Sequence, residues 1–325
     1  MHLRANSTLH WLSRPALNLA SLLFKTVSLV NLKIKALAPR HFPGLFIISV
    51  DNLSFGGTGK TPLVMAIGRV LAERALPFAI ILRGYRSALE NKGALVQAAH
   101  SLEEVGDEAW LLKKRFPGHD VIIGRDRMRS IAAVAARNNR FIILDDGLQT
   151  SQVRKDFSIM LVNPGHPYFF LRHFKFLARG ENLVLHYQQR SGAGEALPSP
   201  WTYDFAIEGF LDGRDRPVNI GNAEIVAFAA LGDNERFKRD MGHYRLRAFR
   251  GFPDHHAFSP ADVHSLEKLR REKGAAWIVC TEKDFCKISH LLDAASPFIY
   301  ARNRIELPGH VIEQIIQHAA EKNFL

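Results

Sequence analysis

Apolar and polar residues between positions 47 and 82 follow a pattern that is typical of a strand, a helix and a second strand. Residues 47–50 form a short apolar run that ends before a glycine-rich turn. Apolar side chains then recur at helical spacing from Leu63 to Leu71. A second short apolar run follows at 78–82, and we expect it to be a buried strand.

The same alternation continues to residue 162. The expected elements are strands at 78–82, 121–124, 141–144 and 157–162, and helices at 102–115 and 126–138. Short apolar runs separated by helices are typical of a parallel sheet that helices cover on both faces. The expected fold class is therefore α/β, with a P-loop-type α/β/α sandwich built on a mostly parallel sheet.

A polar stretch at 188–200, which contains glycine and proline, predicts a connection to a second, smaller α/β unit. In that unit we expect strands at 203–209, 225–229, 277–281 and 297–301, and helices at 234–241, 260–273 and 311–323. The predicted parts are an N-terminal helix at 1–40, a nucleotide-binding domain at 41–187, a linker at 188–222 and a C-terminal domain at 223–325.

Residues 1–40 predict a basic amphipathic helix. Apolar residues fall on one stripe while Arg14, Lys25 and Lys35 lie near the opposite side, and the first 50 residues contain no Asp or Glu. Such a helix suits the headgroup region of an anionic membrane surface, although a helix packed on the core is the alternative. Charges interrupt every apolar run, so we expect neither a spanning helix nor a cleaved signal peptide.

Composition narrows the choice of partner. The 325 residues carry a formal net charge of +11, and 47% of them are hydrophobic, which is ordinary for a globular protein. The basic excess suits an anionic partner, but no nucleic-acid-binding motif is present and we expect no nucleic acid. Two cysteines, Cys280 and Cys286, lack metal-ligand spacing, so we expect reduced thiols and a cytosolic setting.

The glycine-rich turn before Leu63 has the pattern of a phosphate-binding loop. Glycines bring backbone N–H groups close to an anion, the following helix directs its positive end at the same point, Lys60 suits the outer phosphates and Thr61 suits Mg²⁺. Ser54 replaces the first glycine of the motif, so a turn without ligand is the alternative. The residues expected to bind the nucleotide are Ser54, Phe55, Gly56, Gly57, Thr58, Gly59, Lys60 and Thr61.

Further acidic and basic residues follow expected strands or begin a helix. Asp145 and Asp146 end an apolar strand, as in a Walker B element that supports a metal ion, with a solvated turn as the alternative. Asp107 begins a helix, where simple capping is a strong alternative to catalysis. The run Asp254-His255-His256 fits a metal site, a base pair or a surface loop.

Two more segments at strand ends complete the candidates. Arg83 follows the strand at 78–82 and supplies positive charge where phosphate is expected. Residues 281–284, Thr-Glu-Lys-Asp, differ from the guanine-reading motif of GTPases in the place of the lysine, so we do not expect GTP.

Taken together, these blocks resemble the tetraacyldisaccharide 4'-kinase family, the lipid A pathway kinases of Gram-negative bacteria. The blocks that carry the resemblance are residues 52–62, 83–85, 105–108, 144–149, 252–256 and 281–284. The resemblance implies ATP- and Mg²⁺-dependent phosphorylation of the 4'-hydroxyl of a tetraacylated glucosamine disaccharide 1-phosphate. It also implies a peripheral protein, expected to be a monomer, on the cytoplasmic face of the inner membrane.

The resemblance further implies roles for single residues. Asp107 would be the base that takes the hydroxyl proton, paired with His255, or with His256 as the second choice. Lys60 would hold the transferred phosphate, while Thr61, Asp145 and Asp146 would hold the metal.

The segment 150–180 departs from the family pattern, which leaves the acceptor open. The rival interpretations are a deviant Walker-type ATPase stimulated by a protein partner, a kinase for another membrane-bound acceptor, and a nucleotide-sensing adaptor without transfer.

Overall fold

The computed structural model describes residues 39–53, 58–147, 150–163, 181–188, 200–293 and 295–325. The expected N-terminal helix, loop residues Ser54 to Gly57 and most of the 188–200 connection lie outside these ranges, as do residues 164–180 of the segment that departs from the family. Within the described ranges, no helix combines the length and hydrophobicity needed to cross a bilayer.

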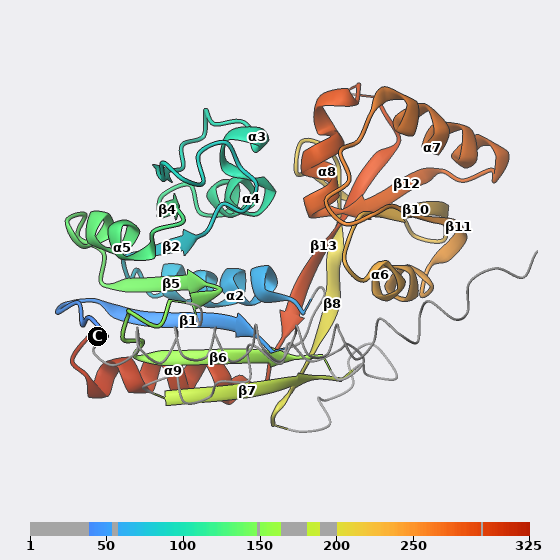
Figure 1. Ribbon diagram of the computed structural model, residues 1–325. Coiled ribbons are helices and arrows are strands. Elements are labelled where there is room, and N and C mark those ends of the chain that lie inside the picture. Colours follow the sequence, from blue (N-terminus) through green and yellow to red (C-terminus); the bar gives the residue numbers. More distant parts are fainter. Residues whose placement is uncertain (1–38, 54–57, 148–149, 164–180, 189–199, 294) are drawn as a thin grey trace, which may run out of the picture.

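The first half of the chain forms a parallel sheet that helices cover on both faces (Figure 1). Its strands are β1 (Phe46–Asn52), β2 (Phe78–Leu82), β3 (Ala94–Leu95), β4 (Asp120–Ile123), β5 (Phe141–Asp145), β6 (Phe157–Val162) and β7 (Glu181–Tyr187). Its helices are α2 (Lys60–Glu73), α3 (Leu102–Val105), α4 (Asp107–Arg115) and α5 (Arg127–Ala135). The spatial order is β7-β6-β1-β5-β2-β4-β3, and β3 is antiparallel to β4.

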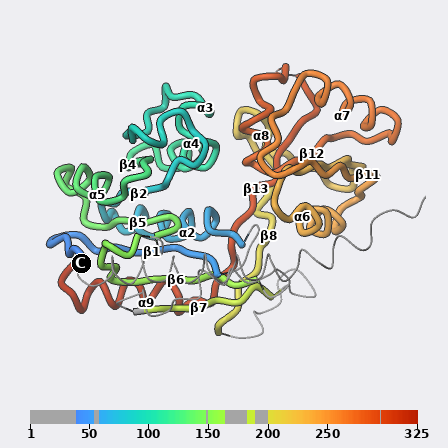
Figure 2. The backbone as a smooth tube through the Cα atoms, in the orientation of Figure 1, coloured from blue at the N-terminus to red at the C-terminus, as the bar shows by residue number. Residues whose placement is uncertain are grey.

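The second half forms a smaller α/β unit. Its strands are β8 (Thr202–Leu211), β9 (Pro217–Val218), β10 (Glu224–Ala229), β11 (Arg245–Gly251), β12 (Trp277–Thr281) and β13 (Phe298–Glu306), and its helices are α6 (Asn234–Met241), α7 (Pro260–Glu272) and α8 (Glu282–Ile288). Strands β8 and β13 run antiparallel, one leaving the first unit and the other returning to it (Figure 2). They join both halves in one thirteen-stranded sheet.

The last helix, α9 (Gly309–Glu321), packs on the first unit. Val311, Ile315 and Ala319 lie in the same buried cluster as β1 and α2, and the ring of Phe324 meets that of Phe46 at 5.5 Å. The division predicted from the sequence counts these residues with the second unit. In the structure the chain therefore returns to the first unit after completing the second.

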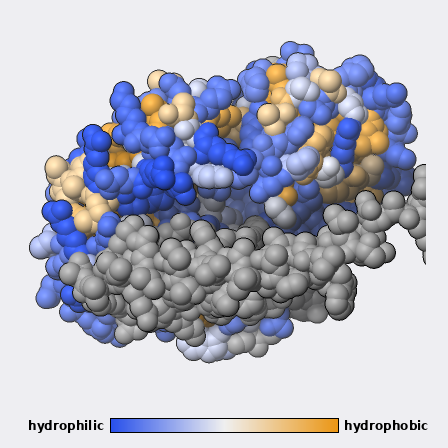
Figure 3. Space-filling model, viewed as in Figure 1, coloured by the Kyte–Doolittle hydropathy of each residue, from blue (hydrophilic) through white to orange (hydrophobic). Residues whose placement is uncertain are grey.

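Alternating strand residues face two buried clusters in each unit, as expected for a sheet covered on both faces. In β1, Phe46, Ile48 and Val50 enter one cluster while Ile47 enters the other. Hydrophilic side chains cover most of the two lobes in Figure 3, with apolar ones in small scattered groups. The α/β fold class predicted from the sequence is confirmed by this architecture.

Besides the two-residue strands β3 and β9, several features of the structure differ from the predicted elements. The helix expected at 102–115 is split at Gly106, whose φ of 86° interrupts it between α3 and α4. Strands β7 and β11 were not predicted, nor was α8, which begins directly after β12. Since α8 carries lysines that reach the site described next, this omission matters most.

Candidate active site

The phosphate-binding loop ends at Gly59, immediately before α2. Gly59 has φ of 90°, and in the described part of the chain no side-chain hydrogen bond caps the start of the helix. Thr58 is 3% exposed, and its Oγ1 has no hydrogen-bond partner in the described part of the chain. Its carbonyl oxygen accepts a hydrogen bond from Tyr203 Oη at 2.8 Å. The positive end of the helix suits an anion.

The close approach of Phe205, on the strand that links the two units, also favours glycine at position 59. A Cβ atom at this position would lie 2.3 Å from Cζ of Phe205, on β8. No larger residue fits unless Phe205 moves, and the left-handed backbone favours glycine independently. The strand that links the two units thus touches the loop directly.

Asp145 and Asp146 lie beside the loop because β1 and β5 are adjacent, with Val50 opposite Asp145. Lys60 Nζ is 3.6 Å from Asp146 Oδ1. Burial raises the pKa of Asp145 to about 7, although the charge of Lys60 lowers it. Within the described ranges, Asp145 Oδ1 is buried without a hydrogen-bond partner.

This donor set fits Mg²⁺. A buried, unpaired carboxylate oxygen is an acceptor that a hard cation satisfies, and Thr61 lies in the first turn of α2. The described residues contain no group of three or more His, Cys, Asp or Glu side chains suited to a metal. Mg²⁺ does not need one, because it commonly takes one or two protein carboxylates together with water and substrate phosphates.

Asp107 begins α4 and faces the second unit. Its Oδ2 is 3.6 Å from His255 Nδ1 and 3.4 Å from Nζ of both Lys283 and Lys287. Burial alone would raise its pKa, but the close contact with His255 and the two ammonium groups outweigh burial and hold the pKa well below its usual range. Asp107 is therefore ionised throughout the neutral range.

Of the two adjacent histidines, the structure brings His255 to Asp107. His255 has φ of 60° and a side chain that is 38% exposed. His256 turns into the second unit, where its Nε2 lies 3.3 Å from Asp262 Oδ2 and its ring stacks on Phe252 at 4.8 Å. Its packing fixes the loop that presents His255.

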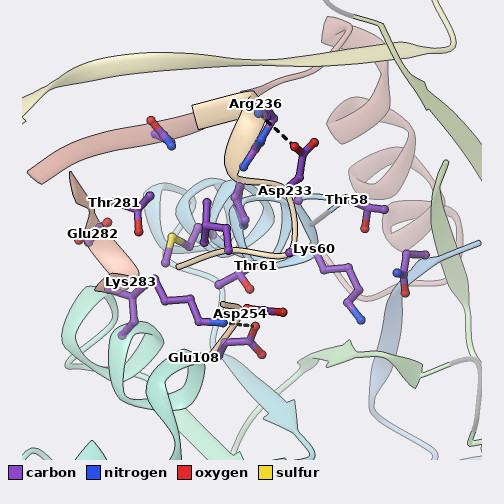
Figure 4. A pocket seen from close by; sticks show the side chains of 18 of the residues that line it. Thr58, Lys60, Thr61, Glu108, Asp233, Arg236, Asp254, Thr281, Glu282 and Lys283 are labelled. Carbon is purple, nitrogen blue, oxygen red and sulfur yellow. Dashed lines mark hydrogen bonds and ion pairs between the residues drawn. The ribbon is translucent and has the colours of Figure 1, made fainter. Parts of the chain in front are cut away.

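Two adjoining cavities connect these groups. One, of about 310 Å³, is lined by Asp107, Asp145 and Arg127 together with Lys60 and His255. The other, of about 290 Å³, shares Lys60 and His255. Figure 4 shows this second pocket, with Lys60 and Thr61 between Arg236 on one side and Lys283 and Glu108 on the other. Because Lys60 lines both cavities, a group bound at Lys60 is accessible from either.

The segment 281–284 both lines the second cavity and stabilises the start of α8. Thr281 Oγ1 caps α8 by accepting from Asp284 N–H at 3.1 Å, and Asp284 Oδ2 accepts from Ala230 N–H at 3.0 Å. The carboxylate that a guanine-reading motif would offer to a base is thus engaged by the protein.

Sequence reasoning named Lys283 only as part of the segment 281–284 and missed Lys287, and it placed neither beside Asp107. Their spacing of four residues places both on one face of α8, and this spacing was the available signal. It also missed Arg236, which α6 carries into the second cavity. Arg83, expected near phosphate, lines the first cavity while its Nε pairs with Glu90 Oε1 at 2.7 Å.

Comparison with known proteins gives consistent matches. Residues 13–320 match the family described as Tetraacyldisaccharide-1-P 4'-kinase. The Tetraacyldisaccharide 4'-kinase of Methylobacterium nodulans is 33% identical over 279 residues, which cover 77% of this chain and 76% of that protein. The protein of the same name from Desulfatibacillum aliphaticivorans is 27% identical over 274 residues, covering 75% and 74%.

A solved structure matches along nearly the whole chain. The crystal structure of LpxK from Aquifex aeolicus in complex with ATP has a TM-score of 0.69 and 23% identity, and covers 94% of this chain and 98% of that one. This similarity shows that the two proteins share a fold.

Proposed function

We propose that the two cavities described above form the active site of this chain, which belongs to the tetraacyldisaccharide 4'-kinase family and is an ATP-dependent kinase of lipid A synthesis. The glycolipid acceptor is a tetraacylated glucosamine disaccharide 1-phosphate, and the product carries a new phosphate on the 4'-oxygen. A partner-stimulated ATPase is not favoured, because the family match extends over both units.

The nucleotide binds at the open end of α2. Residues 54–61 hold its phosphates through backbone N–H groups, and Lys60 contacts the phosphoryl group that is transferred. Support comes from the uncapped helix end at Gly59 and from the position of Lys60 between the two cavities. Mg²⁺, held by Thr61, Asp145 and Asp146, would neutralise phosphate charge.

The acceptor hydroxyl binds near Asp107. Its oxygen attacks the γ-phosphorus, the bond to the β-phosphate oxygen breaks and ADP leaves, while the hydroxyl proton passes to Asp107. Because its pKa is held low, Asp107 orients the hydroxyl from the start and takes the proton late, which suits a loose phosphoryl-transfer transition state. His255 positions Asp107 from the second unit.

The observation that carries these roles is the position of Asp107 Oδ2, 3.6 Å from His255 Nδ1, in a cavity that Lys60 and Asp145 also line. The base, the phosphate-binding lysine and the metal ligand thereby share one space. We further propose peripheral attachment to the cytoplasmic face of the inner membrane through the basic residues 1–40, with the protein acting as a monomer.

The test is transfer of labelled γ-phosphate from Mg·ATP to tetraacyldisaccharide 1-phosphate in detergent micelles. Wild type should label the glycolipid, Lys60→Ala and Asp107→Ala should lose the label, and Asp107→Ala should keep its ATP affinity. Glu103→Gln, an exposed acidic residue near the start of α4, is the matched control and should behave as wild type. Wild-type ATP binding without labelled glycolipid would contradict the proposed acceptor.

A further inference from the structure

Arg236, in the first turn of α6, is a half-buried cation, and two nitrogen atoms of its guanidinium group are fully buried. Within the described part of the chain, its Nε and Nη1 are both buried and have no hydrogen-bond partner. The guanidinium carbon lies 4.0 Å from the centre of the Phe205 ring. Stacking on an aromatic face holds a guanidinium in one orientation but leaves its N–H groups free.

Phe205 connects Arg236 to the phosphate-binding loop. The edge of the ring, at Cζ and Cε1, lies closest to Gly59, and the guanidinium of Arg236 lies over the ring, so this one side chain neighbours both the loop and Arg236. Arg236 also lines the cavity of about 290 Å³ that Thr58, Gly59 and Thr61 line. Figure 4 places it across this cavity from Lys283 and Glu108.

The surrounding carboxylates leave these donors available. Asp233 Oδ1 accepts from the backbone N–H of Arg236, at 3.0 Å, and thereby caps α6. Burial raises the pKa of Asp240 to about 6, although the charge of Arg236 lowers it. Since a buried N–H without a partner is unfavourable, the site gains most from a ligand that brings its own anionic oxygen.

We propose that Arg236 is a nucleotide-binding residue contributed by the second unit, and that its guanidinium contacts the phosphate chain of ATP. The loop backbone cradles the α- and β-phosphates while Lys60 reaches the β- and γ-phosphates. Arg236 approaches from the Gly59 side, so its contact is with the phosphates nearer the ribose. This inference rests on the proposed kinase function.

The contact between Arg236 and the phosphate chain would also let bound nucleotide influence how the two units are positioned relative to each other. The loop belongs to the first unit and Arg236 to the second, so a phosphate held by both links the two units. Bound ATP thereby favours the arrangement in which His255 faces Asp107.

The test compares the full chain with Arg236→Met, Arg236→Lys and Lys238→Met by competition of ATP, ADP and adenosine against a fluorescent ATP analogue. Arg236→Met should weaken ATP and ADP by about 10- to 100-fold and leave adenosine within about twofold, because it removes charged hydrogen bonds to phosphate only. Arg236→Lys should recover part of the loss, since it keeps the charge without the planar fork. Lys238→Met, on the exposed face of α6, is the control and should match wild type.

The kinetics should follow the binding. Arg236→Met should raise KM for ATP more than it lowers kcat, whereas a residue that only supports the fold would lower the amount of active protein at unchanged KM. Unchanged near-ultraviolet circular dichroism verifies that the variant is folded.

Two results would overturn the assignment. Equal weakening of ATP, ADP and adenosine would place Arg236 at the base or ribose, and wild-type affinity for all three would remove it from the nucleotide site. Either result with active wild-type enzyme refutes this inference alone. Wild type that binds no ATP refutes the proposed function as well.

Discussion

The phosphate-binding loop and the Asp107 cluster lie on one composite cavity but are built in different ways. The loop is a continuous segment between β1 and α2, two elements that share one buried cluster. Asp107, in contrast, belongs to the first unit while His255, Lys283 and Lys287 belong to the second. The loop itself thus depends mainly on local chain geometry, and in our proposal the second unit adds only Arg236 to it, whereas the proposed transfer step requires both units in register.

The largest expected effect separates the two adjacent histidines. His255→Asn should lower the transfer rate by about 100-fold and leave ATP affinity unchanged, because the Asp107 partner is lost while the loop is intact. Asparagine tolerates the left-handed backbone at this position. His256→Asn is the matched control and should transfer at a rate close to that of wild type. Steady-state kinetics at saturating ATP measure the transfer rates of both variants. A greater loss of rate in His256→Asn than in His255→Asn would assign His256, not His255, as the partner of Asp107.

A substitution in the phosphate-binding loop should instead affect ATP binding. Gly59→Ala should weaken ATP binding by at least about tenfold, since a Cβ there meets both the left-handed backbone and the ring of Phe205. Gly44→Ala shares the positive φ, at 81°, but has no atom within 4 Å of its added Cβ. It should cost about 1 kcal/mol of stability, by the backbone alone, and leave ATP affinity unchanged. Equal ATP affinities for the two variants would contradict the steric role of Phe205.

The same contrast explains which parts of the site could be predicted from the sequence. The loop and the Asp145-Asp146 pair are contiguous motifs, and strand order alone brings them together. His255 was assigned to Asp107 only through the family resemblance, since no sequence spacing relates residues that face each other from two units. Lys283 and Lys287 were not assigned to Asp107 because α8, which has only seven residues, was not predicted, so their four-residue spacing could not be placed on a helix face.

As with the site, some elements of the fold could be predicted from the sequence and others could not. Strands β2, β6 and β12 and helix α6 match the predicted ranges to the residue, because compact apolar runs or clear caps define them. Strand β11, Arg-Leu-Arg-Ala-Phe-Arg-Gly, lies at the edge of the sheet, where charged residues are tolerated and the apolar signal is weak. Nor did any local pattern indicate that α9 returns to the first sheet.

A smaller effect concerns the stability of the nucleotide-free protein. Asp145 has a raised pKa of about 7, so the stability that its protonated form contributes is lost as the pH rises through 7. Asp145→Asn lacks this penalty and should be more stable than wild type at pH 8, by on the order of 1–3 kcal/mol, with the difference shrinking toward pH 5. It should also be inactive. Thermal unfolding across this pH range measures the difference, and a variant less stable than wild type at pH 8 would contradict the buried charge.

The smallest expected effect tests whether ion pairs between the units hold the Asp107 cluster in register. Arg115 Nη2, on α4, lies 2.6 Å from Glu282 Oε2, on α8, and the two side chains are 20% and 12% exposed. Arg115→Gln or Glu282→Gln should lower the transfer rate by about threefold to tenfold, because either loosens α8, which carries Lys283 and Lys287. The double variant should be no slower than the worse single one.

The matched control for these single and double variants is Arg137→Gln. It breaks an ion pair inside the first unit, between Arg137 Nε and Asp120 Oδ2 at 2.8 Å, and should leave the transfer rate unchanged. ATP affinity should fall less than the transfer rate in the Arg115 and Glu282 variants, because the loop lies within the first unit, and it should match wild type in Arg137→Gln. Additive losses in the double variant would show that Arg115 and Glu282 act separately. A loss of ATP affinity as large as the loss of rate would show that nucleotide binding depends on how the units are joined as strongly as transfer does.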